Sequence, residues 1–537
     1  MTQISRRSLL KLGGAGALAA LGVPSLAACG SGGGASTTSD SGGVAWPTYQ
    51  RLEGPAADLR SSMDGGCDAF FRYPRQLATS VTEKPGDGSD VTAFVLTYSP
   101  PPAPVDDNRF WQAINEALGV NIKLTLVPVA EYSAKLATLM AAGDLPDIIL
   151  IQEAPRTRDF VAAKCADLSE HLSGDAVKEY PNLANLATAS WRTMGRINGG
   201  IYGIPLTRAI VGIGMHVNRT LFDSVNAPVD WTKDQFVTAL DGVTKGRVYG
   251  LGASAADLAM DYHASSFGAP NMWRLDGDRL VSMYETPEYK AAVDFARQCF
   301  ADGYYHPTSR TGTMTDIMNQ YYAGNVGAAW GNFMNYATGI YIDRVGGRFT
   351  TDVAMPYGGG HWLGDAMFGY TVFKKASPER IKMLLRICNY LCAPYGTKEY
   401  ELVNEGVEGV HFTRTDGGLQ KTDLASTENK NSVPISRYIC NAPEIINVPG
   451  KEQETRHAFE VQEALLKKGV TNPSLGYASA TADRVSSKIT QDLHDVRTGV
   501  VTGRLSMSDW DAAVTKWRDG GGAKIAEELT ADRAANK

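Results

Sequence analysis

The feature that most limits the possible folds is a regular alternation of strand and helix patterns between residues 91 and 151. Amphipathic helix patterns at residues 108–118 and 131–142 are each followed by a glycine, a common helix stop. They separate three strand patterns, at residues 91–98, 120–127 and 148–151. The last strand is entirely apolar, which is typical of a central parallel strand. Right-handed crossovers then predict a doubly wound α/β sheet, whose ligands bind beyond the carboxyl ends of the strands.

The remainder of the chain predicts a mixed α/β protein of more than one domain. Its 537 residues are 43% hydrophobic and 20% charged, an ordinary composition for a globular protein. No internal repeat is visible. A net charge of −6 without a basic patch argues against a nucleic-acid partner. Further long helices are predicted at about 287–302, 377–392, 453–468 and 479–497.

The first 29 residues have the pattern of an export signal. A basic head is followed by an apolar run that ends at Cys29, and the run is too short for a permanent membrane span. Leu26-Ala27-Ala28-Cys29 resembles the bacterial lipobox, which implies that Cys29 becomes a lipidated N-terminus. Residues 5–11, SRRSLLK, resemble a twin-arginine export motif, with an ordinary secretory signal as the alternative. We therefore expect a protein anchored by lipid to the outer face of the cytoplasmic membrane.

The segments that follow the signal are expected to be poor in regular structure. Residues 1–28 form the signal peptide, and residues 29–45 form the lipidated cysteine and a flexible Gly/Ser linker. Residues 46–90 read as an irregular, loosely structured lead-in. Removal of the signal takes away three basic residues and changes the net charge from −6 to about −9.

Six cysteines remain besides Cys29, an even number that permits disulfides without fixing their pairing. Cys388 and Cys392 lie four residues apart on a predicted helix. They could form a disulfide or bind a metal, but no second Cys or His pair completes a tetrahedral set of ligands. The favoured interpretation is that both are small apolar residues on a buried helix face.

Several motifs resemble one family. Gly143-Asp144-Leu145-Pro146-Asp147 resembles a signature of the extracellular solute-binding proteins of family 1, the sugar receptors of ABC importers. Residues 198–205, NGGIYGIP, are similar to a second segment of that family, and residues 405–411, EGVEGVH, to its large oligosaccharide-type subgroup. Other similar segments occur in the family's order at 215–221, 231–240, 267–269, 286–289 and 323–327. The resemblance covers residues 93–415 and leaves the lead-in unexplained.

The resemblance implies a type II periplasmic-binding-protein-like clamshell, in which each lobe is a doubly wound α/β sandwich. Residues 91–214 and 356–400 would form lobe 1, and residues 215–355 and 401–537 would form lobe 2. The chain would cross between the lobes more than once, and hinge closure would trap a sugar in the cleft. The implied partners are ABC permease subunits with a cytoplasmic ATPase, and we expect the protein to be a monomer without a cofactor.

A sugar needs flat aromatic surfaces for its C–H faces and polar groups for its hydroxyls. Trp330 is similar to a strand-end tryptophan that stacks on sugar in the family, and Asn332 lies beside it. Trp273, Trp362 and Trp191 are further candidates. For each tryptophan the alternative is packing in a core or between lobes.

The polar candidates come from strand ends and glycine-rich turns. Gln152 and Glu153 directly follow the third strand, where ligands of such sheets bind. Glu408 lies between two glycines, with a solvated turn as the alternative. Asp261 and His263 belong to a polar and aromatic cluster whose alternative is a partly solvated helix face.

Common catalytic layouts are missing from the sequence. There is no Gly-x-Ser-x-Gly elbow, no His-Glu-x-x-His motif and no Walker phosphate loop. Asp276-Gly277-Asp278 begins like a calcium-binding loop, but the remaining ligand spacing is absent, so a polar turn is predicted. A bound calcium ion is possible, but no sequence motif supports it. A lipid-anchored glycoside hydrolase stays open as an alternative, because two carboxylates on different strands leave no motif.

We therefore predict an extracellular solute-binding protein that captures an oligosaccharide and delivers it to an ABC importer. The protein is not expected to be an enzyme. A receptor for a non-sugar solute such as a peptide, or an adhesion lipoprotein, stays open. The acidic mature chain has no obvious Arg/Lys cluster in its sequence, which weakly disfavours strongly anionic sugars.

Overall fold

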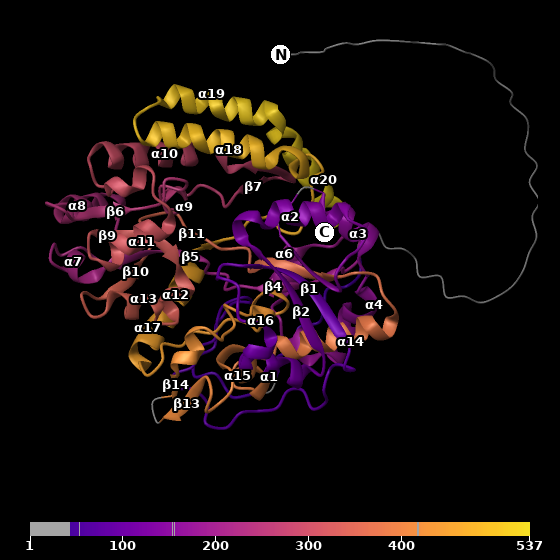
Figure 1. Cartoon of the computed structure of the whole chain (residues 1–537). Helices are drawn as coiled ribbons and strands as arrows, with labels where there is room; N and C mark the ends of the chain where they lie inside the picture. Colours follow the sequence, from indigo (N-terminus) through magenta and orange to yellow (C-terminus); the bar gives the residue numbers. More distant parts are fainter. Residues whose placement is uncertain (1–42, 53, 153, 155, 416–417, 537) are drawn as a thin grey trace, which may run out of the picture. The chain divides into compact units, whose positions relative to one another are not determined.

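The computed structural model describes residues 43–52, 54–152, 154, 156–415 and 418–536 (Figure 1). The predicted signal peptide, Cys29, most of the Gly/Ser linker and Glu153 lie outside the described residues.

The first sheet confirms the predicted strand–helix alternation. Its five strands run in the order β2-β1-β3-β12-β4, and β1 pairs in parallel with both β2 and β3. β12 is antiparallel to both β3 and β4. The elements are β1 (Asp90–Thr97), α1 (Arg109–Leu118), β2 (Asn121–Pro128), α2 (Val129–Ala141), β3 (Ile148–Ile151), β4 (Gly203–Thr207) and β12 (Met367–Phe373).

Local chemistry explains these boundaries. The Asn108 side chain accepts a hydrogen bond from the Trp111 amide at 2.9 Å and caps the start of α1. Gly119 ends the same helix in the left-handed conformation, with a φ of 66°, which a glycine adopts without steric cost. All four residues of β3 are buried, as expected for a strand covered on both faces.

The second sheet has four strands in the order β10-β5-β9-β6. β5 runs antiparallel to β10 and β9, and β6 runs parallel to β9. Figure 1 shows this sheet on the left and the first sheet on the right. We call the cores around the first and second sheets the first and second lobe. The strands are β5 (Ile213–Asn218), β6 (Tyr249–Gly252), β9 (Val326–Asn332) and β10 (Thr351–Ala354).

Helices and short hairpins surround both sheets. Those packed in the first lobe are α3 (Thr157–Lys164), α4 (Ser169–Leu172), α5 (Pro181–Ala184), α6 (Thr188–Met194), α14 (Pro378–Leu391), α15 (Lys398–Glu405) and α16 (Ile435–Tyr438). Those packed around the second sheet are α7 (Arg219–Asp223), α8 (Lys233–Val243), α9 (Met260–Ser266), α10 (Pro287–Ala301), α11 (Met314–Tyr322), α12 (Phe333–Ala337), α13 (Ile340–Val345) and α17 (Glu452–Lys467).

The last part of the chain adds a helical layer to the second lobe. The helices α18 (Ala482–Val501), α19 (Met507–Trp517) and α20 (Ala523–Ala535) share one core with α10, and Figure 1 shows α18 and α19 beside α10 at the top. The two-stranded pairs are β7 (Trp273–Asp276) with β8 (Arg279–Ser282), β11 (His361–Trp362) with β15 (Gly469–Val470), and β13 (Phe412–Thr415) with β14 (Gly418–Lys421).

Two outcomes concern the predicted boundaries and turns. Val403, Ile435 and Ile439 are buried in the core of the first sheet, so α15 and α16 pack with the first lobe although residues 401–537 were assigned to lobe 2. Their apolar side chains complete a surface formed by α1 and α14. The predicted polar turn at Asp276-Gly277-Asp278 joins β7 to β8.

The six cysteines of the described part of the chain are buried free thiols. Cys388 and Cys392 are fully buried at the end of α14, which confirms the prediction of a buried helix face. Within the described ranges, no helix combines the length and apolar character needed to cross a membrane.

The lead-in differs from the expected loose segment. Its described residues from 46 to 89 form no helix or strand, as predicted, and Asp90 begins β1, but these residues make specific contacts. Cys67 is buried, and its backbone N–H and C=O both bond to the side-chain amide of Gln462 on α17, each at 2.9 Å. The lead-in is therefore anchored to the second lobe before the chain enters β1.

Candidate functional site

The candidate site begins at the carboxyl edge of the first sheet. Tyr98 directly follows β1, Gln152 follows β3 and Arg208 follows β4. Phe368 enters the same edge from the start of the antiparallel strand β12. The Gln152 side-chain amide donates to the Phe368 carbonyl at 3.2 Å. Polar and aromatic side chains from distant parts of the chain therefore converge where α/β sheets bind ligands.

A group of aromatic rings and guanidinium groups covers this edge, and we call it the edge cluster. It consists of Tyr98, Arg208, Phe368, Arg437 and Tyr438. The Tyr438 ring centroid lies 6.4 Å from that of Tyr98 and 5.4 Å from that of Phe368. Arg208 lies over the Phe368 ring at 4.7 Å, and Arg437 lies over the Tyr438 ring at 5.6 Å. These are the distances of stabilising aromatic and cation–π contacts.

Members of the edge cluster differ in exposure. Tyr98 is 63% exposed, an unusual state for a large ring that packs on another. Arg437 is exposed, Arg208 and Phe368 are half-buried, and Tyr438 is buried. Burial lowers the pKa of the Arg208 guanidinium, an effect that the nearby Glu444 carboxylate partly opposes. Arginine still carries its charge at neutral pH. The cluster therefore presents an open ring and two cations.

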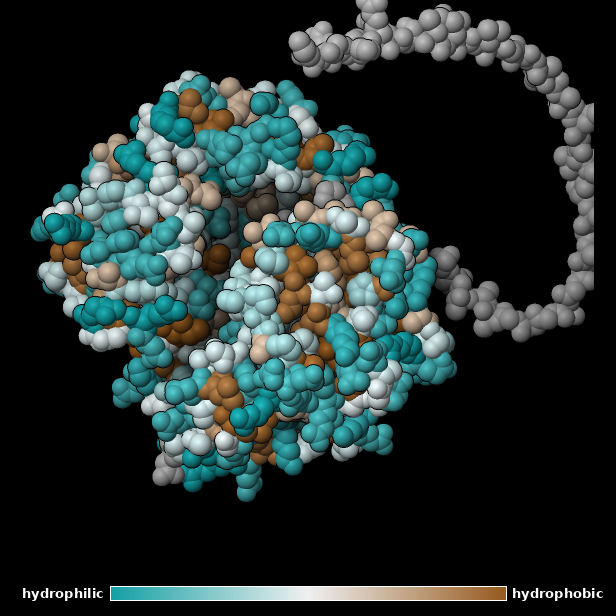
Figure 2. All heavy atoms as spheres, in the orientation of Figure 1, coloured by the Kyte–Doolittle hydropathy of each residue, from teal (hydrophilic) through white to brown (hydrophobic). Residues whose placement is uncertain are grey.

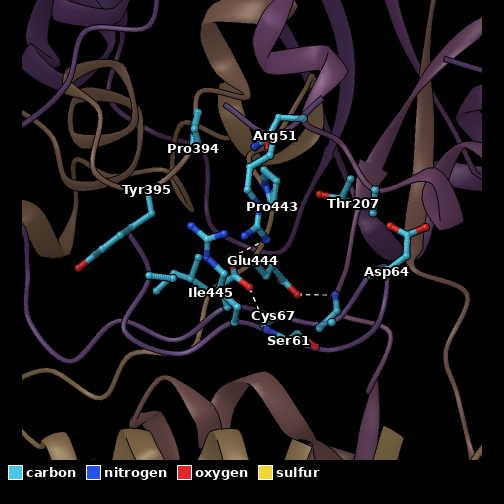
Figure 3. Close-up of a pocket in the computed structure, with 18 of the residues that line it drawn as sticks. Arg51, Ser61, Asp64, Cys67, Thr207, Pro394, Tyr395, Pro443, Glu444 and Ile445 are labelled. Atoms are coloured by element: carbon cyan, nitrogen blue, oxygen red, sulfur yellow. Dashed lines mark hydrogen bonds and ion pairs between the residues drawn. The ribbon is translucent and has the colours of Figure 1, made fainter. Parts of the chain in front are cut away.

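A cavity of about 950 Å³ adjoins the end of β4 (Figure 3). Thr207 and Arg208 line one side of it, and the segment 443–445 lines another. The lead-in supplies much of the remaining wall through residues 49–68, including Arg51 and Asp64. The size lies within the range of small-molecule binding sites.

The acidic groups of this wall already have partners. Asp68 forms an ion pair with Arg51 at 2.9 Å. Asp64 accepts the Ala189 amide at 2.9 Å, and Glu444 accepts the Ala209 amide at 2.8 Å. These carboxylates hold the lead-in and the segment after β4 in place.

The cavity lies where the chain passes from one sheet to the other. Residues 208–212 connect β4 of the first sheet to β5 of the second. The Asn441 side chain donates to the Thr207 carbonyl at 3.1 Å, which ties a second crossing segment to the first. The Ile210 amide bonds to the Gly65 carbonyl of the lead-in at 3.1 Å. Figure 2 shows the surface hollowed between the two lobes.

The structure buries three of the four candidate tryptophans. Trp191 is 1% exposed in the core of the first lobe. Trp330 is 4% exposed on β9 and packs on Tyr262, and Trp273 is 8% exposed and packs on Trp517. Their rings are covered by protein, which is the core-packing alternative of the sequence analysis.

His263 and Asp261 belong to networks inside the second lobe. The two ring nitrogens of His263 lie 2.9 Å from the Tyr357 hydroxyl and 3.0 Å from the Tyr305 hydroxyl. Burial lowers the pKa of His263 to about 3. Burial and the neighbouring Asp257 raise the pKa of Asp261 to about 7, while Arg497 acts in the opposite direction.

The remaining candidates lie apart from one another and from the edge cluster. Asn332 is exposed at the end of β9, where its side chain accepts the Asn335 amide at 3.1 Å and caps α12. The Trp362 ring is half-buried, and its indole N–H donates to the Ala269 carbonyl at 2.9 Å. Glu408 forms an exposed ion pair with Arg414 at 3.0 Å. Of the candidates in the described ranges, Gln152 is the one that contacts the edge cluster.

Sequence reasoning missed the members of the edge cluster. Tyr98 lies at the end of a predicted strand, so the rule that led to Gln152 could have found it. Arg208 follows β4, which was not predicted as a strand. Phe368 and Tyr438 carry no such signal, because neither β12 nor α16 was predicted. Among the described residues, no group of three or more His, Cys, Asp or Glu side chains is arranged to hold a metal ion.

Comparison with known proteins fits this architecture. Residues 110–400, more than half of the chain, match the family described as bacterial extracellular solute-binding proteins. The chain belongs to this family. The fold is accordingly the two-lobed α/β fold of type II solute-binding proteins, as the sequence predicted.

Relatives and a solved structure support the assignment over most of the chain. Lipoprotein LipO of Bacillus subtilis (strain 168) is 22% identical over 88% of this chain and 96% of its own length. The polygalacturonan/rhamnogalacturonan-binding protein YtcQ of the same organism is 23% identical over 81% of this chain and 89% of its own. The N-glycan transport solute-binding protein NgtS of Streptococcus pneumoniae superposes with a TM-score of 0.61 at 16% identity, covering 83% of this chain and 98% of NgtS.

Proposed function

We propose that this protein binds an oligosaccharide between its two lobes and delivers it to an ABC importer. The edge cluster is the observation that carries the proposal. An exposed tyrosine ring in a row with two further rings suits the apolar face of a sugar, and the flanking amide and guanidinium groups suit its hydroxyls. The sites of soluble receptors commonly combine such a surface with a few polar groups.

The relatives support a saccharide as the ligand class. YtcQ is named for binding plant polysaccharides, and NgtS for N-glycan transport. Gln152 and Asn332 are the polar candidates at strand ends that we assign to hydroxyl binding. Sugar capture would bring the lobes together by a hinge motion around the crossing segments near Thr207 and Asn441.

The same proposal covers the cellular context. The export signal and Cys29 would place a lipid-anchored monomer outside the cytoplasmic membrane, and the family and the lipoprotein relative LipO support this location. Permease subunits with a cytoplasmic ATPase would receive the sugar. Binding without conversion is expected, because the family consists of binding proteins.

Calorimetric titration of the mature domain from Gly30, without lipid, tests the proposal. Oligosaccharides of two to four units are titrated singly and recovered for chromatography afterwards. Saturable one-to-one binding with intact sugar is expected. Chemical conversion of the sugar would show that the protein is a glycoside hydrolase and not a receptor. If no saccharide binds, sugars are excluded as the ligand class.

The Tyr98→Ala variant links binding to the edge cluster. Tyr98 is 63% exposed, so its loss removes a stacking surface with little effect on the fold. Leu505→Ala is the control, because Leu505 is another exposed apolar side chain, at 40%, and lies between α18 and α19, outside the cavity. We expect Tyr98→Ala to weaken sugar binding by tenfold or more and Leu505→Ala to weaken it by less than threefold.

A further inference from the structure

We infer that the sugar bound at the edge cluster carries a carboxylate, as uronic and sialic acids do, and that Arg208 and Arg437 bind it. This inference rests on the proposed function and names the chemical class of its ligand. It starts from two guanidinium groups that reach one edge of the first sheet from distant parts of the chain, at residues 208 and 437.

Neither guanidinium forms an ion pair with a carboxylate of the described residues. The described part of the chain offers no ion pair to Arg208 or Arg437, whereas Arg219, Arg380 and Arg414 all form one. Arg208 donates to the Thr207 carbonyl at 2.7 Å, and Arg437 donates to the Tyr438 hydroxyl at 3.1 Å and to the Asn431 side chain. These acceptors are neutral, so among the residues that the structure describes no opposite charge contacts either guanidinium.

The Glu444 carboxylate acts on Arg208 but forms no ion pair with it. Glu444 interacts with Arg208 only through space, while its Oε2 accepts the Ala209 amide at 2.8 Å. Arg208 is half-buried, and its other face lies on the Phe368 ring. A partly desolvated cation without a paired anion is costly, and a ligand carboxylate would remove that cost on binding.

The geometry of the two guanidinium groups suits a carboxylate. A guanidinium group is planar and binds a carboxylate through two parallel hydrogen bonds. The rings of Phe368 and Tyr438 hold the two guanidinium planes, and the open ring of Tyr98 lies beside Tyr438. A sugar that stacks on Tyr98 would thus place an acidic substituent near these cations, which a neutral sugar would leave unpaired.

This inference differs from the weak expectation based on the net charge. The mature chain is acidic, and its arginines are dispersed in the sequence. Folding places two of them at one edge, so the local charge of the site is opposite to that of the whole molecule. A single carboxylate needs only a few nearby cations, and the net charge says little about them.

A matched pair of ligands tests the inference. The mature domain is titrated calorimetrically with trigalacturonate and with trigalactose of the same linkage, and with sialyllactose and lactose as a second acidic and neutral pair. In at least one pair we expect the acidic member to bind ten times more tightly or better, and more weakly as salt is raised from 50 to 500 mM.

Variants assign the preference to the two arginines. Arg208→Gln and Arg437→Gln should each reduce the preference for the acidic sugar at least fivefold, and Arg208→Lys should restore it only in part, because lysine lacks the planar fork. Arg310→Gln is the control, since Arg310 also stacks on a phenylalanine, Phe300, at 4.6 Å. Arg437 is exposed, so its variant remains informative if Arg208→Gln fails to fold.

The outcomes separate this inference from the proposed function. Binding of the neutral sugar as tightly as its acidic partner in both pairs would overturn the inference and leave the proposed function in place. An acidic preference that survives both glutamine variants would also overturn it. If no saccharide of either class binds, the proposed function fails, and the inference fails with it.

Discussion

His216, His263 and His361 are three of the four histidines that are fully or almost fully buried in the folded protein. Burial lowers their pKa values to about 4, 3 and 4, respectively, whereas an unfolded histidine has a pKa of about 6.5. In the folded state each ring therefore stays neutral at pH values where the unfolded chain takes up a proton. Their contribution to stability is complete above about pH 6.5 and is lost as the pH falls toward 4.

We therefore predict that the protein becomes less stable below neutral pH. Each histidine can change the free energy of unfolding by up to about 1.4 kcal/mol per pH unit. The raised pKa of Asp261, about 7, acts in the opposite direction, because its protonation favours the folded state as the pH falls. Urea unfolding between pH 5 and 8 measures the net slope, which His263→Gln should reduce. A free energy of unfolding that does not fall from pH 7 to pH 5 would contradict the prediction.

A second prediction separates core rings from ligand-binding rings. Trp330 is 4% exposed, and Trp330→Phe should cost about 1–3 kcal/mol of stability through the cavity that it leaves. We expect this variant to bind the sugar as the parent protein does. Thermal unfolding and calorimetry measure the two effects. A tenfold loss of affinity without a loss of stability would make Trp330 a sugar contact.

At the scale of elements, the sequence predicted the helices and strands whose boundaries are set by local side-chain patterns. The strands before and after α1 and α2 were found within two residues, because their side-chain periodicity and flanking glycines are encoded locally. β12 and β4 escaped prediction as strands of the first sheet. Each gains its partners from segments more than fifty residues away, a pairing that tertiary contacts decide.

The lead-in shows the same limit and leads to a third prediction. Gln462 of α17 satisfies both backbone groups of Cys67 at a fully buried position. Gln462→Ala should leave these groups unpaired and cost about 2–4 kcal/mol. Limited proteolysis with mass spectrometry should then show faster cleavage between residues 52 and 66. Glu460→Ala, an exposed change on the same helix, is the control and should leave cleavage unchanged. Equal cleavage in both variants would mean that other contacts hold the lead-in.

At the scale of the whole molecule, the family motifs predicted the two-lobed fold but not the composition of the site. A strand-end tryptophan such as Trp330 looks the same in sequence whether its ring faces a core or a cleft. Gln152 was found because β3 was predicted from the sequence, and the topology of such sheets places ligands at the carboxyl ends of their strands. The edge cluster needed Tyr438 and Arg437, which reach the first lobe only because α16 packs there.

The last prediction concerns a contact between the two lobes that does not involve the crossing segments. It joins the loop after β15 to the end of α6. Gly476 lies in the loop after β15 and faces α6 of the first lobe, where a Cβ atom would come within 2.1 Å of the Arg192 carbonyl oxygen. Gly195, at the end of α6, has equally little room, because its Cβ would lie 2.4 Å from the Gly476 carbonyl oxygen. The two backbones can approach this closely only because both residues are glycines.

Gly476→Ala should therefore hold the lobes apart and weaken sugar binding by tenfold or more, because capture depends on their closure. Gly503→Ala is the control: Gly503 has a similar positive φ, 77° against 83°, but nothing lies within 4 Å of its Cβ position. It should cost about 1–2 kcal/mol of stability through the left-handed backbone alone and leave affinity unchanged. Calorimetry and small-angle scattering with and without sugar measure both effects. If Gly476→Ala binds and compacts as the control does, the contact between Gly195 and Gly476 has no part in closure.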